Sequence, residues 1–283
     1  MGRPHIEFIQ SQRLAWQPMD GLGRPGVDAK LLSADNVTGA ASLLLRYPAG
    51  WRQAKPAFLT ADEELFVLQG AVQINGVVHG RHSYAFLPRG HLRRDFLSTT
   101  GAVVLTFLSA AARTETAELP HADYDTARLV ERIDSAALGW DHMGGNAGAS
   151  HLHAARKTLR RDVSGRSHSY LSGGMPHSCP KNGTAPLEKH PHVEEMFLVA
   201  GDMPCSLGVL RAGAYFWRPA EVWHGADCTL TGFLAFVRTI GSSRTVSIWD
   251  ERLHPILWDP PHRPVLPNDL KPFGDPIDDP VEY

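Results

Sequence analysis

The chain has 283 residues, of which 43% are hydrophobic and 20% are charged, and its 28 basic and 30 acidic residues give a formal net charge of −2. This composition is typical of a globular protein with a hydrophobic core, and the lack of a long basic block argues against nucleic-acid binding. No apolar run reaches the roughly 18 residues of a membrane span, and the N-terminus lacks the apolar core of a signal peptide. We therefore expect a cytoplasmic protein that does not bind membranes.

Short apolar segments separated by turn-forming residues run through the first 120 residues. Segments of four to eight residues between turn signals are typical of strands in a β-sandwich or barrel. The clearest are Ala41–Leu45, Leu65–Leu68, Tyr84–Leu87 and Val103–Leu108. They predict an N-terminal all-β domain over residues 1–120.

The segment Asp123–Ala137 is the best helical candidate, and we expect a linker over residues 121–149 that contains this helix. Apolar runs at Met196–Val199 and Phe233–Val237 predict a second all-β domain over residues 150–250. Eight prolines follow between positions 255 and 280. Proline at that density prevents regular structure, so residues 251–283 should form an extended proline-rich tail.

The two halves are related by an internal repeat. Shifting the chain by 131 residues, without a gap, aligns identical residues at turn and strand-end positions. The aligned pairs include Glu63–Glu64 with Glu194–Glu195, Phe66 with Phe197, Gly70 with Gly201, Tyr84 with Tyr215 and Pro88 with Pro219. A duplicated β domain explains this order.

The second copy carries a set of metal-binding residue types. His190, His192 and Glu194 alternate along one segment, and residues two apart on a strand share a face. His224 follows some 30 residues later, within a neighbouring strand region. Three histidines and one carboxylate suit a divalent iron, manganese, nickel, copper or zinc ion. Glu195 is an alternative to Glu194, although strand parity favours Glu194.

These blocks resemble the two motifs of the cupin superfamily. They read His190-x-His192-x-Glu194-x6-Gly201 and Gly213-x5-Pro219-x4-His224, and the likeness extends over roughly residues 30–115 and 150–245. It is nearest to ChrR-like cupins and to bacterial two-cupin proteins of similar length. The gap between His192 and the glutamate is shorter than is usual in cupins, and Glu221 stands where a turn glycine is common.

The resemblance implies two tandem cupin β-sandwich barrels of the double-stranded β-helix, or jelly-roll, type. It also implies one divalent metal ion, with iron as the first choice and manganese, nickel, copper or zinc as alternatives. The ligands would be His190, His192, Glu194 and His224.

The first copy has lost this site. Under the 131-residue offset only the carboxylate, Glu63, is retained, and the other three ligand positions hold Leu59, Ala61 and Arg93. A buried carboxylate without a partner is unfavourable, and arginine can meet it with two charge-assisted hydrogen bonds. We therefore predict a Glu63–Arg93 ion pair inside the first domain, where a metal would otherwise lie.

Within the cupins, the resemblance implies dioxygenases, isomerases, lyases and decarboxylases. We expect a metal-dependent enzyme that acts on a small organic molecule, and a mononuclear Fe(II) dioxygenase is the first choice. The alternatives are a ChrR-like metal-binding sensor or regulatory cupin and a structural metal-binding protein without catalysis. A homo-oligomer is compatible with each of them.

An aromatic or anionic substrate would suit the side chains near the predicted site. Four aromatic residues lie on or beside the strands that carry the ligands, and three arginines could hold an anionic group. These residues are Tyr215, Trp217, Trp223 and Phe236, and Arg211, Arg218 and Arg238.

Overall fold

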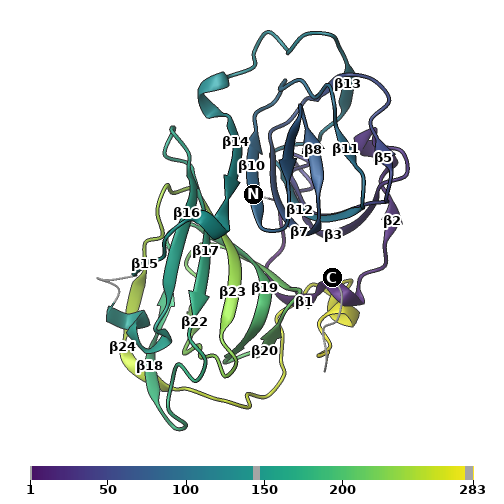
Figure 1. Ribbon diagram of the computed structural model, residues 1–283. Helices are drawn as coiled ribbons and strands as arrows, with labels where there is room; N and C mark the ends of the chain where they lie inside the picture. The colour runs from purple at the N-terminus through teal and green to yellow at the C-terminus, as the bar shows by residue number, and fades with distance from the viewer. Residues whose placement is uncertain (1, 143–146, 278–282) are drawn as a thin grey trace. The chain divides into compact units, whose positions relative to one another are not determined.

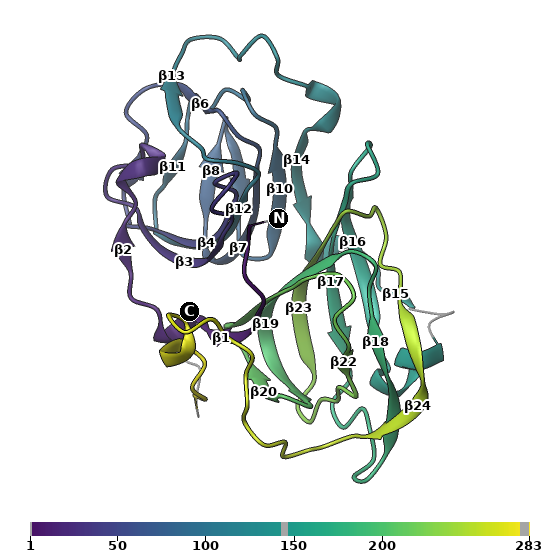
Figure 2. The same cartoon turned by 180° about the vertical axis from the view of Figure 1, so that it is seen from behind.

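The computed structural model describes residues 2–142, 147–277 and 283. The chain divides into two compact units, which Figures 1 and 2 show from opposite sides. Unit 1 comprises Met1–Arg3 and Leu14–Leu138, and unit 2 comprises Pro4–Arg13 and Gly139–Tyr283. Among the described residues the strands of both units pair antiparallel and the helices are short 3-10 turns, which confirms the predicted all-β class. No helix in the described ranges is long and apolar enough to cross a bilayer.

Unit 1 contains one large antiparallel sheet and two small ones. The large sheet has the order β14 (Val130–Asp134), β10 (Ser83–Leu87), β7 (Glu63–Gly70), β12 (Ala102–Leu108), β4 (Ala41–Tyr47), β3 (Asp28–Ala34) and β2 (Gln17–Pro18). The small sheets are β5 (Trp51–Arg52), β11 (Leu97–Ser98), β8 (Val72–Ile74) and β9 (Val77–His79), and the pair β13 (Thr114–Thr116) and β6 (Ala57–Leu59).

Unit 2 repeats this arrangement. Its large sheet has the order β1 (Ile6–Gln10), β21 (Ala214–Arg218), β19 (Val193–Cys205), β23 (Phe233–Ile240), β17 (Ser167–Gly174), β16 (Ala155–Arg161) and β15 (Asp141–His142), with β20 (Gly208–Arg211) paired to β19. A second sheet contains β22 (His224–Gly225), β18 (Thr184–Lys189) and β24 (Ile248–Pro255). Neither large sheet closes on itself through the strand pairs of the described residues.

The repeated glycines mark the same backbone constraint in both units. Gly70 ends β7 and Gly201 lies at the equivalent position of β19, and both have positive φ angles, of 66° and 79°. A Cβ atom at these positions would lie 2.0 Å from the carbonyl oxygen of Gly101 and 1.8 Å from that of Gly232. Only glycine fits such an approach, so the repeat preserves glycine at both positions.

Each large sheet has an outer strand that the sequence did not predict. β1 lies near the N-terminus but belongs to unit 2, where it pairs with β21. β14 lies in the expected linker and pairs with β10 of unit 1. Both strands are recruited by the equivalent edge of a large sheet.

The predicted linker helix over Asp123–Ala137 is wrong. The segment forms two single 3-10 turns, η3 (Thr126–Arg128) and η4 (Ser135–Ala137), on either side of β14. Asp125 and Asp134 each accept a hydrogen bond from the backbone two residues on, which favours an isolated turn over a continuing helix. Sheet pairing along β14 then outweighs the weak helical preference of this segment.

The proline-rich tail begins later than predicted. Residues 251–255 belong to β24, which pairs with β18, so the strand continues past the expected boundary. Beyond Pro255, the described residues up to 277 form only the 3-10 turn η6 (Lys271–Phe273) and an isolated bridge between Val265 and Glu7. This part is extended, as expected from its prolines.

The predicted ion pair in unit 1 is confirmed. Arg93 Nη2 lies 2.7 Å from Glu63 Oε2, and both side chains are buried. Arg24 binds the same carboxylate in a bidentate manner, with hydrogen bonds of 2.7 and 2.8 Å, and it also donates to the hydroxyl of Tyr47. Burial opposes ionisation of Glu63, but the two guanidinium groups outweigh it and lower its pKa to about 2. The sequence did not predict Arg24, which lies outside the repeated motif.

Each unit also buries a histidine whose Nδ1 atom has no hydrogen-bond partner among the described residues. These are His79 in unit 1 and His168 in unit 2. Burial, followed by nearby arginines, lowers the pKa of His79 to about 4 and that of His168 to about 3. As the pH falls, both histidines become protonated near pH 6.5 in the unfolded chain, but only at a lower pH in the folded chain. Their contribution to stability is therefore complete above pH 6.5 and is lost as the pH falls toward the folded pKa values.

We expect the free energy of unfolding of the metal-free protein to fall between pH 6 and pH 4. The slope should be up to about 1.4 kcal/mol per pH unit for each of the two histidines. Urea unfolding at stepped pH measures it, and His79→Gln together with His168→Gln should reduce the slope. An unchanged slope in this double variant would show that other groups cause the acid sensitivity.

Candidate metal centre

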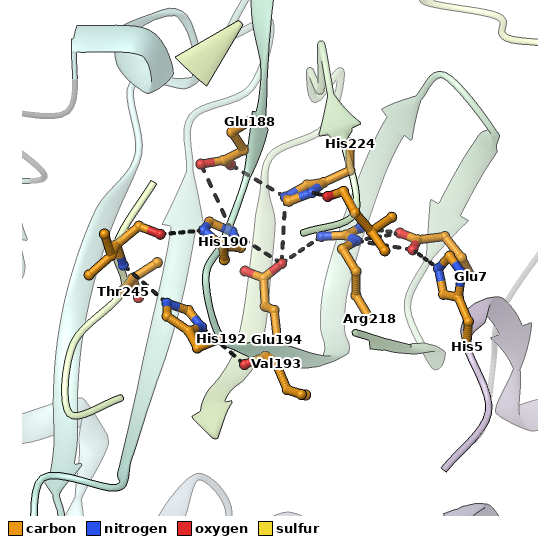
Figure 3. Close-up of polar contacts among 12 residues, drawn as sticks. His5, Glu7, Glu188, His190, His192, Val193, Glu194, Arg218, His224 and Thr245 are labelled. Carbon is orange, nitrogen blue, oxygen red and sulfur yellow. Dashed lines mark hydrogen bonds and ion pairs between the residues drawn. The ribbon is translucent and has the colours of Figure 1, made fainter. Parts of the chain in front are cut away.

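Four side chains of unit 2 converge on one point, as Figure 3 shows: Glu188, His190, Glu194 and His224. Glu188 lies near the end of β18 and His190 directly follows that strand, while Glu194 lies at the start of β19 and His224 opens β22. β18 pairs with β22 so that Glu188 and His224 are directly opposite one another. Strand pairing therefore brings together groups that are 36 positions apart in the sequence.

The polar atoms of these side chains face one another at short range. His190 Nε2 lies 3.6 Å from Glu194 Oε2 and 4.0 Å from Glu188 Oε2. His224 Nε2 lies 3.6 Å from Glu194 Oε2 and 3.7 Å from Glu188 Oε1. One atom each from Glu188, His190 and His224 fall within 4.8 Å of one another, close enough to share an ion.

Backbone carbonyl groups orient the two histidines. His190 Nδ1 donates to the carbonyl oxygen of Val246 at 2.8 Å, and His224 Nδ1 donates to that of Val222 at 3.0 Å. Because a carbonyl can only accept, each Nδ1 carries a proton, and Nε2 is the atom of each ring that faces the cluster and can offer a lone pair to an ion. His190 Nε2 is buried and has no hydrogen-bond partner in the described part of the chain.

His192 lies beside the cluster and is engaged elsewhere. Its Nδ1 donates to the carbonyl oxygen of Val193 at 3.1 Å, and its Nε2 accepts from the backbone N–H of Val246 at 3.1 Å. A bend at residues 191–192 precedes β19. The His192 ring stacks on that of His190, with ring centroids 5.1 Å apart, so the predicted ligand His192 lies next to the cluster although both of its nitrogens bond to backbone groups. His192 instead holds the segment whose carbonyl orients His190.

Strand parity separates the two adjacent glutamates. Glu194 points to the cluster, whereas Glu195 lies on the opposite face of β19. There Glu195 accepts hydrogen bonds from the hydroxyl of Tyr215 at 2.6 Å and from Arg238 Nη1 at 2.7 Å. Of the two candidates, Glu194 is therefore the one near the histidines.

The sequence interpretation did not include Glu188. The signal that could have identified it is the same period of two, because Glu188 precedes His190 by two positions on an extended segment. Applying the alternation backwards from His190, rather than only forwards, would have led to it.

A chain of charged groups holds Glu194 in place. Arg218, opposite Glu194 in the pairing of β19 with β21, lies with its Nη1 2.5 Å from Glu194 Oε2. The same guanidinium binds Glu7 of β1 through its Nε, at 2.9 and 3.0 Å, and through its Nη2. Glu7 in turn accepts from His5 Nε2 at 2.8 Å. Through Glu7 and Arg218, strand β1 therefore helps to position Glu194 in the candidate centre.

The protonation of the cluster reflects its excess of carboxylates. Burial and the neighbouring Glu194 raise the pKa of Glu188, whereas His190, Arg218 and His224 outweigh burial and lower that of Glu194. The carboxylates also overcome burial to raise the pKa of His190 to about 9. Burial and Arg218 lower the pKa of His224 to about 3, so this ring is neutral.

The donor set fits a divalent cation. Three carboxylates, those of Glu7, Glu188 and Glu194, lie near the Arg218 guanidinium and the His190 ring. Glu194 and Glu188 keep that ring protonated in the absence of a metal, so one negative charge remains in excess in a buried region. Imidazole nitrogen and carboxylate oxygen suit iron, manganese or zinc, and the orphaned Nε2 of His190 would gain a partner. Cys205 is nearby, but burial raises its pKa to about 12, so it stays a protonated thiol rather than a thiolate ligand.

Comparison with known protein families identifies the family of this chain. Residues 7–246 match the model of the family described as "Domain of unknown function (DUF4437)". The chain belongs to the DUF4437 family. No curated protein matches it.

Solved structures share the fold of this DUF4437 protein. A candidate dioxygenase from Nostoc punctiforme has a TM-score of 0.76 and 21% identity, with 89% of this chain and 92% of that chain covered. The protein Ylba from E. coli has a TM-score of 0.56 and 13% identity, covering 86% and 93%. A variant of oxalate decarboxylase from B. subtilis has a TM-score of 0.55 and 11% identity, covering 88% and 80%. Together with the strand content, these likenesses confirm the all-β cupin class.

A cavity of about 90 Å³ opens beside the cluster in this DUF4437 chain. One water needs only about 10–15 Å³ on this measure, so the cavity can admit a small organic molecule. Glu188, His190, Glu194 and His224 are among its lining residues. Most of the others are apolar, and they include Met196, Met203, Leu210, Phe216, Phe233 and Val237.

The four aromatic residues near the predicted ligands do not line this cavity. Tyr215, Trp217 and Phe236 are buried away from it, and Trp223 is 45% exposed. On β21 the residues facing the cavity are Phe216 and Arg218, which alternate with Tyr215 and Trp217. Strand alternation alone could not say which of the two sets faced inward.

The three arginines identified in the sequence lie in different surroundings. Arg218 lines the cavity, but Glu7 and Glu194 already pair with it. Arg238 pairs with Glu195 on the other face of the sheet, and Arg211 is not part of the cavity wall. The structure adds Asp227, a wall residue whose pKa is raised to about 7 because burial and the nearby carboxylates outweigh Arg218.

Proposed function

We propose that this protein is a metal-dependent cupin enzyme that acts on a small organic molecule, in its specific form a mononuclear Fe(II) dioxygenase. Glu188, His190, Glu194 and His224 would hold the ion. The observation that carries this proposal is the convergence of two histidine Nε2 atoms and two carboxylates in the wall of a cavity. A structural metal site would instead be closed by protein groups.

The chain's own residues prepare the site for catalysis. When bound, a divalent ion supplies Lewis acidity, and iron also supplies redox chemistry. The carbonyl groups of Val246 and Val222 fix the direction of the two histidine rings, and Arg218 fixes Glu194. Asp227 can hold or release a proton near neutral pH at the cavity wall, and the apolar lining residues are less favourable neighbours for water than for an organic molecule.

The structural neighbours support this proposal at the level of chemistry. One is a candidate dioxygenase, and the oxalate decarboxylase of B. subtilis has Mn(II) centres. Their ions and reactions belong to those proteins. They show that a similar fold can carry a redox-active divalent metal, and the donor set of this chain is of a kind that suits one.

Metal analysis of protein purified without a histidine tag tests the proposal. We expect about one divalent ion per chain, as in a mononuclear site, and oxygen consumption by the iron-loaded protein that depends on an added substrate. Oxygen uptake across a panel of small organic molecules gives the second readout. Protein that binds zinc tightly and consumes no oxygen with any of them would contradict the oxygenase and favour a sensor or structural role.

A further inference from the structure

One cation in the cavity wall has no carboxylate partner among the described residues. Arg156 lies on β16, opposite Ser172 of β17, and lines the cavity together with the candidate metal centre. Within the described residues, no carboxylate pairs with its guanidinium, and its Nε is buried without a hydrogen-bond partner. Arg218, the other arginine in this wall, is paired on both sides. Buried donors without an acceptor are unfavourable, so Arg156 is suited to receive an anionic group from a ligand.

The surroundings hold this guanidinium in one orientation. Its central carbon lies 4.0 Å from the centre of the Tyr170 ring, so the planar group lies over the aromatic face. The Tyr170 hydroxyl accepts a hydrogen bond from Thr245 Oγ1 at 3.0 Å, which anchors the ring. A stacked arginine keeps its N–H edge available, and that edge matches a carboxylate with two hydrogen bonds.

The remaining wall restricts the rest of the ligand. Glu188, Glu194 and Asp227 also line the cavity and would repel a second negative charge. Most of the other lining residues are apolar, with Met196, Phe216 and Phe233 among them. We propose that this cavity binds small monocarboxylic acids with an apolar body, whose carboxylate meets Arg156. As the substrate class of the enzyme, this inference rests on the proposed function.

Binding of acids compared with their primary amides tests the inference. The probes are butyrate with butyramide and phenylacetate with phenylacetamide, measured by isothermal titration calorimetry on the full chain, both as purified and after chelator treatment. We expect wild-type protein to prefer each acid by about 10- to 100-fold, the range for a charge-assisted pair. Arg156→Gln should reduce this preference to within about threefold, and Arg156→Lys should retain part of it.

Arg161→Gln is the matched control, because Arg161 is exposed on the same strand, and it should keep the full preference. Thermal unfolding checks that each variant is folded. If Arg156→Gln does not fold, the comparison of acid with amide in wild type and in Arg156→Lys still decides. Equal affinity of wild type for acids and amides would overturn the inference, as would an equal loss in Arg161→Gln.

Two further outcomes separate this inference from the proposed function. If chelated protein keeps the preference for acids and Arg156→Gln removes it, Arg156 binds the carboxylate whether or not a metal enzyme is present. If the preference survives in Arg156→Gln but disappears on chelation, the metal rather than Arg156 binds the acid. The inference then fails while the proposed metal centre stands.

Discussion

Alanine in place of both His190 and His224 is expected to abolish metal binding by this protein. The two Nε2 atoms are the only imidazole nitrogens that the structure aims at the cluster within the described residues, since both nitrogens of His192 are bonded to backbone groups. Without them, two carboxylates remain, and these are weak ligands for borderline metals. Metal content after equilibration and gel filtration measures the effect.

His192→Ala should give a different result. This change removes support for the segment around Val246, which orients His190, but leaves all four converging side chains in place. We expect affinity to fall by about 10- to 100-fold, as for a residue that orients a ligand, with full stoichiometry at saturating metal. Failure of His192→Ala to bind metal at saturation would show that His192 is itself a ligand.

A double variant of exposed histidines serves as the control. His177 and His262 are exposed in unit 2 and do not line the cavity, so alanine at both should leave metal content unchanged. Full metal occupancy in the His190→Ala, His224→Ala variant would refute the proposed centre.

The second large effect is expected at Glu63. Glu63→Gln keeps the shape of the side chain but leaves the guanidinium groups of Arg24 and Arg93 buried without a carboxylate. Breaking a buried pair by removing one partner costs about 3–5 kcal/mol, and here one carboxylate serves two cations. We expect a loss at least that large, measured by urea unfolding with a probe of unit 1.

Arg93→Ala should cost less than Glu63→Gln, because Arg24 still makes its two-pronged contact with Glu63. The matched control is Asp28→Asn. The Asp28–Arg46 pair is just as short, at 2.6 Å, but its side chains are 34% and 45% exposed, and such pairs contribute about 0–1 kcal/mol. If Glu63→Gln costs no more than Asp28→Asn, the buried-charge argument is wrong.

A triple variant that replaces Glu63 and both of its arginine partners tests the same argument if Glu63→Gln fails to fold. A triple change of Arg24→Met, Glu63→Leu and Arg93→Met removes all three charges together. It should be more stable than Glu63→Gln alone, because apolar residues of similar volume can replace a buried ionic group without penalty. A triple variant less stable than the single variant would show that packing, rather than charge, dominates this part of unit 1.

Features that follow from a regular spacing along the chain could be predicted from the sequence alone. The alternation of side chains along a strand is local, so it favoured Glu194 over Glu195 before the structure placed Glu194 near the histidines. The 131-residue offset carried strand positions from one half to the other, and so placed Glu63 beside Arg93. The short apolar segments between turn residues predicted an all-β chain because few other structures bury such segments.

Only the tertiary structure decided which groups complete each site. His192 bonds to the backbone of Val193 and Val246, and pairing of β18 with β22 brings Glu188 opposite His224. Arg24 reaches Glu63 from a segment outside the repeat, and Glu7 reaches Arg218 across 211 positions. Such contacts depend on the register between strands that are distant in sequence, and no local pattern along the chain encodes that register.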